Sequence, residues 1–276
     1  HEKTYQSWEG LTKQQLEDDR RQNPYTYENE IDNYKQDHYQ LHWNQKLNQN
    51  WSTNLGLNYT YGRGYYEQYR EDDAVSTYGG IVEATGVDFY GTAVTDLIRR
   101  RWLDNDFYVI NATANYKESD LNLIVGGSYS NYDGDHFGEV IWARQFASET
   151  SIRDQYYFGN GKKTDFSAFA KATYTLNSKI DVYGDLQLRN VGYKTSGLTS
   201  DLENMRIDES YSFFNPKVGV SYQLASNSSL YASYARANRE PSRSDFESNP
   251  DVKPEQLNDF EMGWRYNKEG VMLNIN

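Results

Sequence analysis

The side chains best suited to acid–base chemistry lie close together near the middle of the chain. Asp133, Asp135 and His136 belong to the sequence Asp-Gly-Asp-His. A histidine beside carboxylates can act as a general base near neutral pH, and with Asp106 or Asp185 facing it the group could activate a water molecule. The segment is also rich in turn-forming residues. We favour the simpler interpretation, a solvent-exposed loop tip.

The most concentrated positive charge is the run Arg99, Arg100 and Arg101, directly before Trp102. Guanidinium groups bind carboxylates and phosphates with paired hydrogen bonds, so this run could bind an anionic ligand or a lipopolysaccharide phosphate. A solvated base of a loop is the alternative interpretation.

No metal or cofactor site is predicted. His38 and His42 lie four residues apart. On a strand that spacing separates them by about 13 Å on one face, which is too far to chelate one metal ion. Both histidines are expected to line a polar interior.

The composition limits the elements that could position these groups. Leu, Ile, Val and Phe number 53, about 19% of the 276 residues, and the net charge is −12. Such values are typical of disorder, but an aromatic content of 16% is not. The negative charge argues against a nucleic-acid partner, the absence of cysteine against a disulfide scaffold, and the lack of long apolar runs against membrane-spanning helices.

Apolar and polar residues alternate along the chain, which is the pattern of β-strands with one apolar face. Between Trp51 and Gly62, for example, Leu55, Leu57 and Tyr59 share one face. The same pattern predicts ten strands in five hairpins, at about 39–43 and 51–62, 108–116 and 121–129, 166–176 and 180–188, 218–224 and 230–237, and 260–266 and 271–275.

Short links within hairpins alternate with long links between them. The long links are expected at 67–101, 133–162, 194–210 and 239–254. This rhythm, together with strands of sufficient length, is typical of a transmembrane β-barrel with long extracellular loops. Tyrosines near the strand ends would form the aromatic girdles, namely Tyr59, Tyr61, Tyr116, Tyr129 and Tyr174. A soluble antiparallel sandwich is the alternative fold.

Several segments resemble the barrel of TonB-dependent outer-membrane receptors, particularly those of Bacteroidetes. They are 211–222, 230–241 and 253–264, the last with the step Phe260-Glu261-x-Gly263. Segments 30–41 and 135–139 are similar to the same group. The resemblance implies that residues 1–276 form about ten strands of a larger, 22-strand, antiparallel transmembrane barrel, without the plug domain and the C-terminal strands. It also implies a bacterial outer-membrane location with loops at the cell surface.

The resemblance further implies active import of a scarce ligand, with a ferric siderophore or similar metal complex favoured and no enzymatic activity. Expected partners are outer-membrane lipid, lipopolysaccharide, the imported small ligand, and TonB acting through the plug. Candidate ligand contacts are Trp142, Arg144, Tyr156, Tyr157, Arg99, Arg100 and Arg101. Residues expected to face the lumen are Lys171, Asp185, Gln187, Arg189, Lys217 and Gln223.

Two other functions fit a barrel. A complete ten-strand barrel of this length resembles the omptin type of outer-membrane protease, for which the acidic residues and His136 described above would be the catalytic candidates. A passive porin or a structural barrel without energy coupling is the third possibility.

Overall fold

The computed structural model describes residues 2–3, 12–21, 25 and 27–276. Within them the chain forms one antiparallel sheet of twelve strands, which follow one another in sequence order except that β4 pairs beside β5. Ten of these strands make up the main ladder, namely β2 (Ile31–Lys46), β3 (Trp51–Ala74), β5 (Ala93–Glu118), β6 (Leu121–Ala143), β7 (Gln155–Asn177), β8 (Ile180–Leu198), β9 (Asn204–Ala225), β10 (Ser228–Arg239), β11 (Glu255–Lys268) and the five-residue β12 (Val271–Ile275). The predicted antiparallel all-β fold is confirmed, and each of the ten predicted strands lies within one of these.

The remaining elements are short. They are β1 (Glu2–Lys3), β4 (Gly86–Val87), the 3₁₀ helix η2 (Val75–Tyr78), and the helices α1 (Lys13–Asp18) and α2 (Arg243–Ser248). Both α-helices begin with a capping box, Thr12 with Gln15 in α1 and Ser242 with Asp245 in α2.

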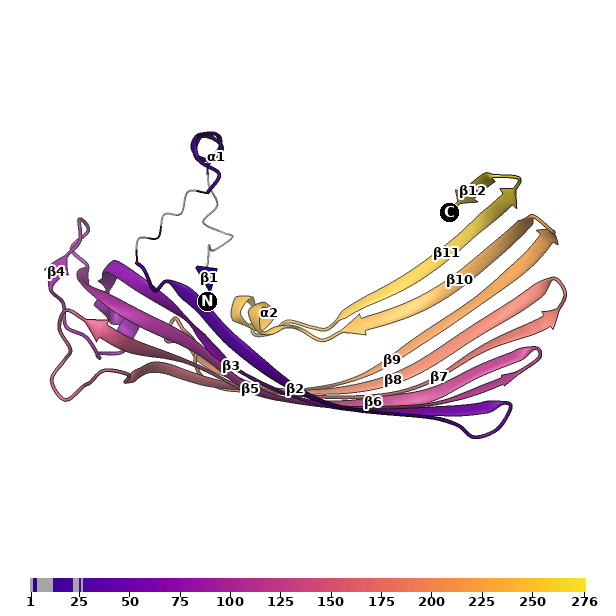
Figure 1. Ribbon diagram of the computed structural model, residues 1–276, viewed down its shortest axis with the longest axis horizontal. Coiled ribbons are helices and arrows are strands. Elements are labelled where there is room, and N and C mark those ends of the chain that lie inside the picture. Colours follow the sequence, from indigo (N-terminus) through magenta and orange to yellow (C-terminus); the bar gives the residue numbers. More distant parts are fainter. Residues whose placement is uncertain (1, 4–11, 22–24, 26) are drawn as a thin grey trace.

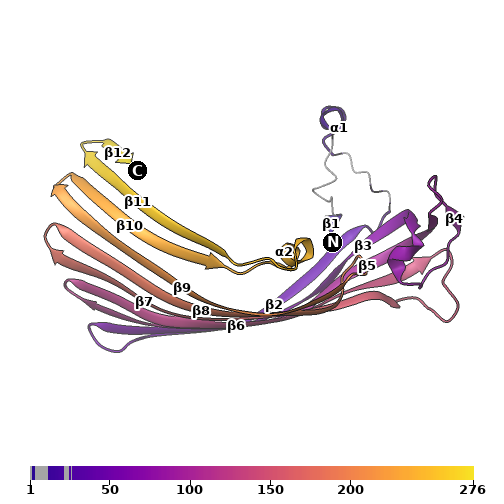
Figure 2. The ribbon, with the colours of Figure 1, turned by 180° about the vertical axis from the view of Figure 1, so that it is seen from behind.

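The sheet is a strongly curved, open trough (Figures 1 and 2). Among the described residues the long strand β2 and the last strand β12 do not pair with each other, so the arc is not closed. Helix α2 lies inside the curve. Phe246 of α2 packs on Tyr193 of β8, with ring centroids 6.1 Å apart. The face of the sheet that carries Tyr193 is therefore the concave face, and the opposite one is called the outer face below.

The strands extend much farther than their apolar alternation predicted. Strand β3 has 24 residues and β5 has 26, whereas about 9–11 residues suffice to cross the hydrocarbon of a membrane. The links predicted at 67–101, 133–162 and 194–210 are consequently wrong in extent, because the connections cover only 75–92, 144–154 and 199–203. The link predicted at 239–254 is confirmed at 240–254.

Polar cross-strand pairs explain the extra strand length. Above the apolar region Arg63 pairs with Asp104 at 3.1 Å and Lys162 with Asp133 at 2.7 Å, each between neighbouring strands. Opposite charges on adjacent strands stabilise the ladder. The backbone pairing continues where neither face is apolar, and hydrophobic alternation cannot reveal such segments.

An apolar belt covers the outer face. Leu57 lies opposite Ile110 and Leu188 opposite Phe214, and all four side chains are exposed. Exposed apolar surface of this extent is the mark of a surface that contacts another apolar medium. The outer face of a membrane-embedded barrel has this property, with a band about 25 Å tall.

Aromatic residues border the belt on both sides. At the border nearer the long connections, the ring of Tyr59 stacks between Tyr39 and Tyr108, with centroid distances of 5.7 and 4.6 Å. Trp51 and Tyr116 are in contact at the other border, with ring centroids 5.0 Å apart. Eight residues separate Trp51 from Tyr59, or about 26 Å of strand. The predicted girdle tyrosines lie on this face, although Tyr59, Tyr61 and Tyr129 border the belt from within their strands rather than at strand ends.

A small hydrophobic core forms at the end of the sheet with the long connections. Residues 75–82 fold back onto β5, β6 and β7, so that Tyr78, Ile81 and Val82 are buried against Leu97 and Val140. The backbone of Val82 pairs with that of Phe146 in the next connection. This core fixes the tops of three strands that supply the site described next.

Candidate functional site

A cavity of about 310 Å³ opens on the concave face, between the tops of the strands and helix α2. Strands β3, β5, β6 and β7 supply its floor through Tyr66, Arg101, His136 and Tyr157. The short connection 199–203 and helix α2 supply the other wall, the latter through Arg243 and Glu247. The site thus joins segments that are far apart in the sequence.

Strand register places the floor residues on one face. Tyr66 lies opposite Arg101, Arg101 opposite Gly138, and Gly138 opposite Tyr157. The absence of a side chain at Gly138 is required here, because an added Cβ would overlap the rings of Tyr156 and Tyr157. Gly138 therefore lets two aromatic rings pack beside the Arg101 guanidinium.

Two arginines at this end of the concave face are bound by neutral groups. Arg101 donates to the hydroxyls of Tyr66 at 3.1 Å and Tyr156 at 3.4 Å. Arg99 is buried and donates to Gln68 Oε1 at 3.0 and 3.2 Å and to the Tyr78 hydroxyl at 3.2 Å. Neither forms an ion pair with a carboxylate within 4.0 Å among the described residues, whose ion pairs involve other arginines. Of the two, Arg101 lines the cavity, whose charged lining also includes Arg243, Asp201 and Glu247.

Tyr78 links the floor of the cavity to the small hydrophobic core formed by residues 75–82 against β5, β6 and β7. Its hydroxyl donates to Asp73 Oδ2 at 2.7 Å while accepting from Arg99. Burial raises the pKa of Tyr78, so the phenol stays neutral at physiological pH. Asp73 is itself paired with Arg70 at 2.8 Å, and its charge is therefore already engaged.

The three consecutive arginines do not form one cluster. Successive side chains of a strand point to opposite faces, so Arg100 lies on the outer face while Arg99 and Arg101 lie on the concave face. Arg100 pairs with the buried carboxylate of Glu67 at 2.8 Å. Glu67 also accepts from Tyr27 at 2.6 Å and Asn29 at 2.7 Å and so ties the segment before β2 to the sheet.

The other predicted contact residues occupy different environments. Tyr156 and Tyr157 lie in β7 and are buried in the small hydrophobic core at this end of the sheet. Trp142 lies in β6 and remains 43% exposed. Arg144 pairs with Asp96, to which its Nε donates at 2.7 Å. Of the seven predicted contacts, Arg101 and Tyr157 line the cavity, and Arg99 and Tyr156 support it from behind.

The six residues predicted to face the lumen all lie on the concave side of their strands. Lys171, Asp185 and Lys217 stand in one row across β7, β8 and β9. In the neighbouring row Gln187 accepts from Asn215 at 3.0 Å. Gln223 is held at the β9–β10 turn, where its amide donates to the carbonyl of Ser228 at 3.2 Å.

Arg189 anchors the connection 240–254 to the concave face. It donates to Asp165 and to both carboxylate oxygens of Glu240, at 2.8 and 3.0 Å. Lys163 also pairs with Glu240. Burial alone would raise the pKa of the Glu240 carboxyl, but the hydrogen bonds from Lys163 and Arg189 outweigh it and hold the pKa below its ordinary value. The buried network fixes the start of the segment that carries α2 over the cavity.

The residues considered as a protease site do not lie together in the structure. Asp133 and Asp135 lie on the outer face, where Asn160 donates to both of them at 2.8 and 2.7 Å. His136, the next residue, points to the concave face and lines the cavity. Asp106 lies opposite Asp133 on the outer face. The sheet thus separates the histidine from these carboxylates, and the loop-tip interpretation of this segment is also wrong, because β6 continues through it.

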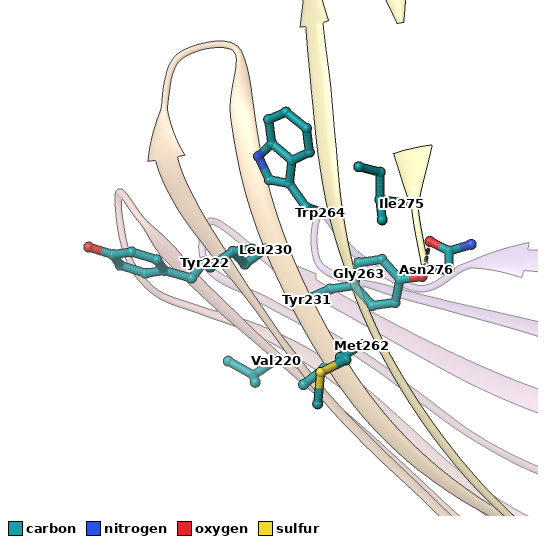
Figure 3. A pocket seen from close by; sticks show the side chains of 10 residues that line it. Val220, Tyr222, Leu230, Tyr231, Met262, Gly263, Trp264, Ile275 and Asn276 are labelled. Carbon is teal, nitrogen blue, oxygen red and sulfur yellow. Dashed lines mark hydrogen bonds between the residues drawn. The ribbon is translucent and has the colours of Figure 1, made fainter. Parts of the chain in front are cut away.

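A larger cavity of about 490 Å³ lies at the edge formed by β9 to β12. Figure 3 shows Val220, Tyr222, Leu230, Met262 and Trp264 around it. It is almost entirely apolar and lies within the belt. We therefore assign it to the lipid-facing surface rather than to ligand recognition.

The apolar belt, the aromatic borders and the polar concave face define an outer-membrane β-barrel wall with a cavity on its inner side that is lined by arginines and carboxylates. In the described part of the chain no helix is long and apolar enough to cross a membrane, and no group of three or more His, Cys, Asp or Glu side chains is arranged to hold a metal ion.

The family described as TonB dependent receptor-like, beta-barrel matches residues 3–276, and the chain belongs to it. Proteins of this family reside in the outer membrane, and the long connections lie on the cell-surface side. No curated protein sequence matches the chain.

Solved structures share the fold. The ferric-catecholate import receptor Fiu of E. coli K12, in its closed form, is 14% identical with a TM-score of 0.62, covering 88% of this chain and 40% of its own. The copper transporter OprC is 15% identical with a TM-score of 0.62, covering 87% and 37%. The unliganded ferric citrate transporter FecA is 15% identical with a TM-score of 0.58, covering 93% and 35%. The chain spans about two fifths of the length of these structures.

Several site residues were not predicted as ligand contacts. Tyr66 and His136 could have been found by extending the strand register from Arg101, since all three share a face. Arg243 and Glu247 lie in α2, whose start is marked in the sequence by the capping box at Ser242. What places α2 over the cavity is the buried contact of Glu240, for which the sequence offers no signal.

Proposed function

We propose that this chain is part of the wall of an active outer-membrane importer, and that the concave cavity contacts its ligand. The observation that carries the proposal is the pair Arg99 and Arg101, which face inward near the cell-surface end and are bound by neutral oxygens. An anionic ligand would supply the missing counter-charge in a partly desolvated setting, where such hydrogen bonds are strong.

The favoured ligand is a ferric siderophore or a similar anionic metal complex. Three structurally similar proteins are the ferric-catecholate import receptor Fiu, the ferric citrate transporter FecA and the siderophore receptor PiuA of Acinetobacter baumannii. Arg101, Tyr66 and Tyr157 would contact the complex, and Arg243 would approach it from α2. The aromatic rings add flat apolar surface beside the charge.

The proposal includes energy coupling. A plug domain within the complete barrel would connect the bound ligand to TonB, and the residues here would form part of the wall. The concave row of Lys171, Asp185 and Lys217 would face the plug or channel water. The outer belt would contact outer-membrane lipid and lipopolysaccharide.

Binding to the full-length receptor tests the ligand assignment. Ferric complexes of catecholate, hydroxamate and citrate chelators are titrated by fluorescence quenching against wild type and Arg101→Gln. We expect the variant to bind the preferred complex about 10-fold more weakly, since a hydrogen bond to a charged group contributes about 1.5–3 kcal/mol. Arg100→Gln, on the outer face, is the matched control and should bind normally. Equal affinities of wild type and Arg101→Gln would refute the role of the cavity.

Uptake in cells separates active import from a passive pore. Accumulation of the bound complex should cease when the proton gradient is dissipated or TonB is deleted. Continued uptake in both conditions would instead support the porin interpretation.

A further inference from the structure

The part of β9 nearest the cell surface has an unpaired edge. Strand β9 pairs with β8 as far as Asn204, but with β10 only as far as Lys217, which lies opposite Ala235. Residues 204–212 therefore have a neighbouring strand on one side only. Within the described part of the chain, no other element forms a backbone hydrogen bond to them on the other side. An edge of this kind is a template for a further strand.

A proline explains why the β9–β10 ladder stops there. The backbone N–H of Gln223 donates to the carbonyl of Lys179 at 2.7 Å, next to β8, whereas the carbonyl of Phe214 accepts from Asn238 of β10 at 3.4 Å. The β8–β9 register is continuous, so odd-numbered residues of β9 direct their backbone groups to β8 and even-numbered ones to the opposite side. Pro216 occupies an even position and has no N–H to donate to β10.

The segment that follows β10 does not cover the edge. Glu240 is bound on the concave face by Arg189 of β8 and Lys163 of β7, and the chain continues to α2 inside the curve (Figure 1). Backbone N–H and C=O groups therefore stay available at the even-numbered positions of the edge, which are Asn204, Arg206, Asp208, Ser210 and Ser212.

An acidic recess of about 330 Å³ lies beside this edge, between residues 203–209 and α2. Phe246 and Pro250 supply an apolar wall. Four carboxylates and one guanidinium form the charged lining, namely Glu203, Asp208, Glu209, Glu247 and Arg206. Asp208 and Glu247 are each paired with a basic residue at 3.0 Å. Glu203 and Glu209 form no ion pair within the described part of the chain, so the recess favours a basic partner and disfavours a second copy of this edge.

Most of the edge lies outside the membrane. Ser212 stands opposite Asn190, and Asn190 opposite Phe166 at the border of the belt. Asn204 is eight residues farther along β9 than Ser212. With strands tilted by about 40°, this spacing corresponds to about 20 Å along the membrane normal. The headgroup layer occupies only about 5–8 Å of it on each side of the bilayer, so the recess is open to the aqueous medium.

We propose that residues 204–212 of β9 bind an extended polypeptide from outside the receptor as an additional antiparallel strand, with basic side chains directed into the recess. Its residues opposite Arg206 and Asp208 would exchange backbone hydrogen bonds with β9. Its residue opposite Glu209 would turn to the concave face, because Glu209 shares that face with Tyr193. A lysine there can lay its aliphatic stem on Phe246 and bring its ammonium group to the carboxylates. The proposal does not depend on the identity of the imported ligand.

A synthetic strand tests the proposal on the full-length receptor in detergent. The probe is the fluorescent, end-capped peptide Thr-Lys-Val-Lys-Val-Lys-Thr, whose binding is measured by fluorescence anisotropy. One control peptide has glutamate in place of every lysine. Two further peptides carry two backbone N-methyl groups, on the valine amides or on two of the lysine amides. With the lysines directed into the recess, the valine amides point to β9 and the lysine amides point away from it.

We expect saturable binding of the lysine peptide and no binding of the glutamate peptide. N-methylation of the valine amides should weaken binding about 25-fold, since each backbone hydrogen bond contributes about fivefold. N-methylation of the lysine amides should have little effect. Equal effects of the two N-methylated peptides would overturn the proposal, as would binding of the glutamate peptide or no saturable binding of the lysine peptide.

Receptor variants and hydrogen exchange locate the binding. Glu203→Gln combined with Glu209→Gln should weaken it about tenfold, since each exposed carboxylate contributes about threefold. The matched control combines Glu83→Gln and Glu149→Gln, two exposed positions in other connections, and should bind like wild type. The peptide should also slow exchange at the amides of the edge residues Arg206, Asp208 and Ser210. Equal losses in the two double variants, or unchanged exchange at these amides, would place the peptide elsewhere and overturn the proposal.

Discussion

Replacing Glu240 by glutamine removes the charge that holds segment 240–254 against the concave wall. Glu240 is 7% exposed, accepts two hydrogen bonds from Arg189 at 2.8 and 3.0 Å, and pairs with Lys163. Removing one partner of a buried ion pair costs about 3–5 kcal/mol. The loss should be smaller here, about 2–3 kcal/mol, because Arg189 keeps Asp165 and glutamine can still accept one charged hydrogen bond. Since 1.4 kcal/mol is a factor of ten, the segment should open about 30- to 150-fold more often.

Hydrogen exchange of the full-length receptor in detergent measures this opening directly. Amides in 240–254 should exchange faster in Glu240→Gln, whereas amides in the β7–β8 ladder should not change. The matched control is Glu255→Gln, which removes an ion pair with Arg239 whose side chains are 70% and 62% exposed. Exposed pairs contribute about 0–1 kcal/mol, so the control should change exchange by at most about fivefold.

The same carboxylate makes the attachment sensitive to acid. Because the folded-state pKa of Glu240 is lowered, its contribution is fully present above the unfolded-state pKa, near 4.5, and is lost as the pH falls through the folded value. Wild-type protection of 240–254 should therefore decrease below about pH 4.5, and Glu240→Gln should abolish that dependence. Equal exchange in wild type and Glu240→Gln would refute the reasoning, and so would an acid dependence retained by the variant.

Two further predictions concern the membrane wall and the cavity floor. Leu186→Arg, within the belt, should destabilise the barrel by about 2–4 kcal/mol in a lipid-based unfolding titration. Asn190→Arg, on the same face but at the border of the belt opposite Phe166, should cost about 0–1 kcal/mol. Equal costs would contradict the placement of the belt. Gly138→Ala should destabilise the cell-surface end by about 1–3 kcal/mol, because the added Cβ overlaps the rings of Tyr156 and Tyr157. Gly161→Ala is the control and should be tolerated in the same measurement, because an added Cβ there meets no atom within 4 Å. If Gly138→Ala were tolerated as well, the tyrosine rings would be able to move aside.

The sequence predicted the membrane-spanning part of the fold well because one physical constraint governs it. Between Trp51 and Tyr59 every second residue must be compatible with lipid, and the resulting alternation identifies both the strand and its two faces. All six residues assigned to the lumen lie on the concave face for the same reason. The pairing between neighbouring strands followed from the short links within hairpins.

Above the membrane that constraint ends, and the predictions failed there. Beyond the aromatic border both faces of a strand contact polar surroundings. Strand β3 continues to Ala74, but no apolar alternation marks this part of it in the sequence. Segments 67–74 and 93–101 therefore read as loops, although cross-strand pairs such as Glu67 with Arg100 hold them in the ladder. Charge complementarity between neighbouring strands cannot be recognised in the sequence without knowing their register.

The error in extent explains why the candidate site was only partly predicted. Treating residues 99–101 as a loop made three arginines one basic cluster, and treating 133–136 as a loop tip made His136 a neighbour of two carboxylates. Once both segments are strands, alternation divides each group between the faces: Arg99, Arg101 and His136 turn inward, and Arg100, Asp133 and Asp135 turn outward. Consecutive polar residues above the apolar belt thus serve two surfaces at once, one on the concave face and one on the outer face. A substitution at Arg100 should accordingly leave ligand binding intact while one at Arg101 impairs it, and a receptor whose two variants lose affinity equally would place these residues in a loop rather than in β5.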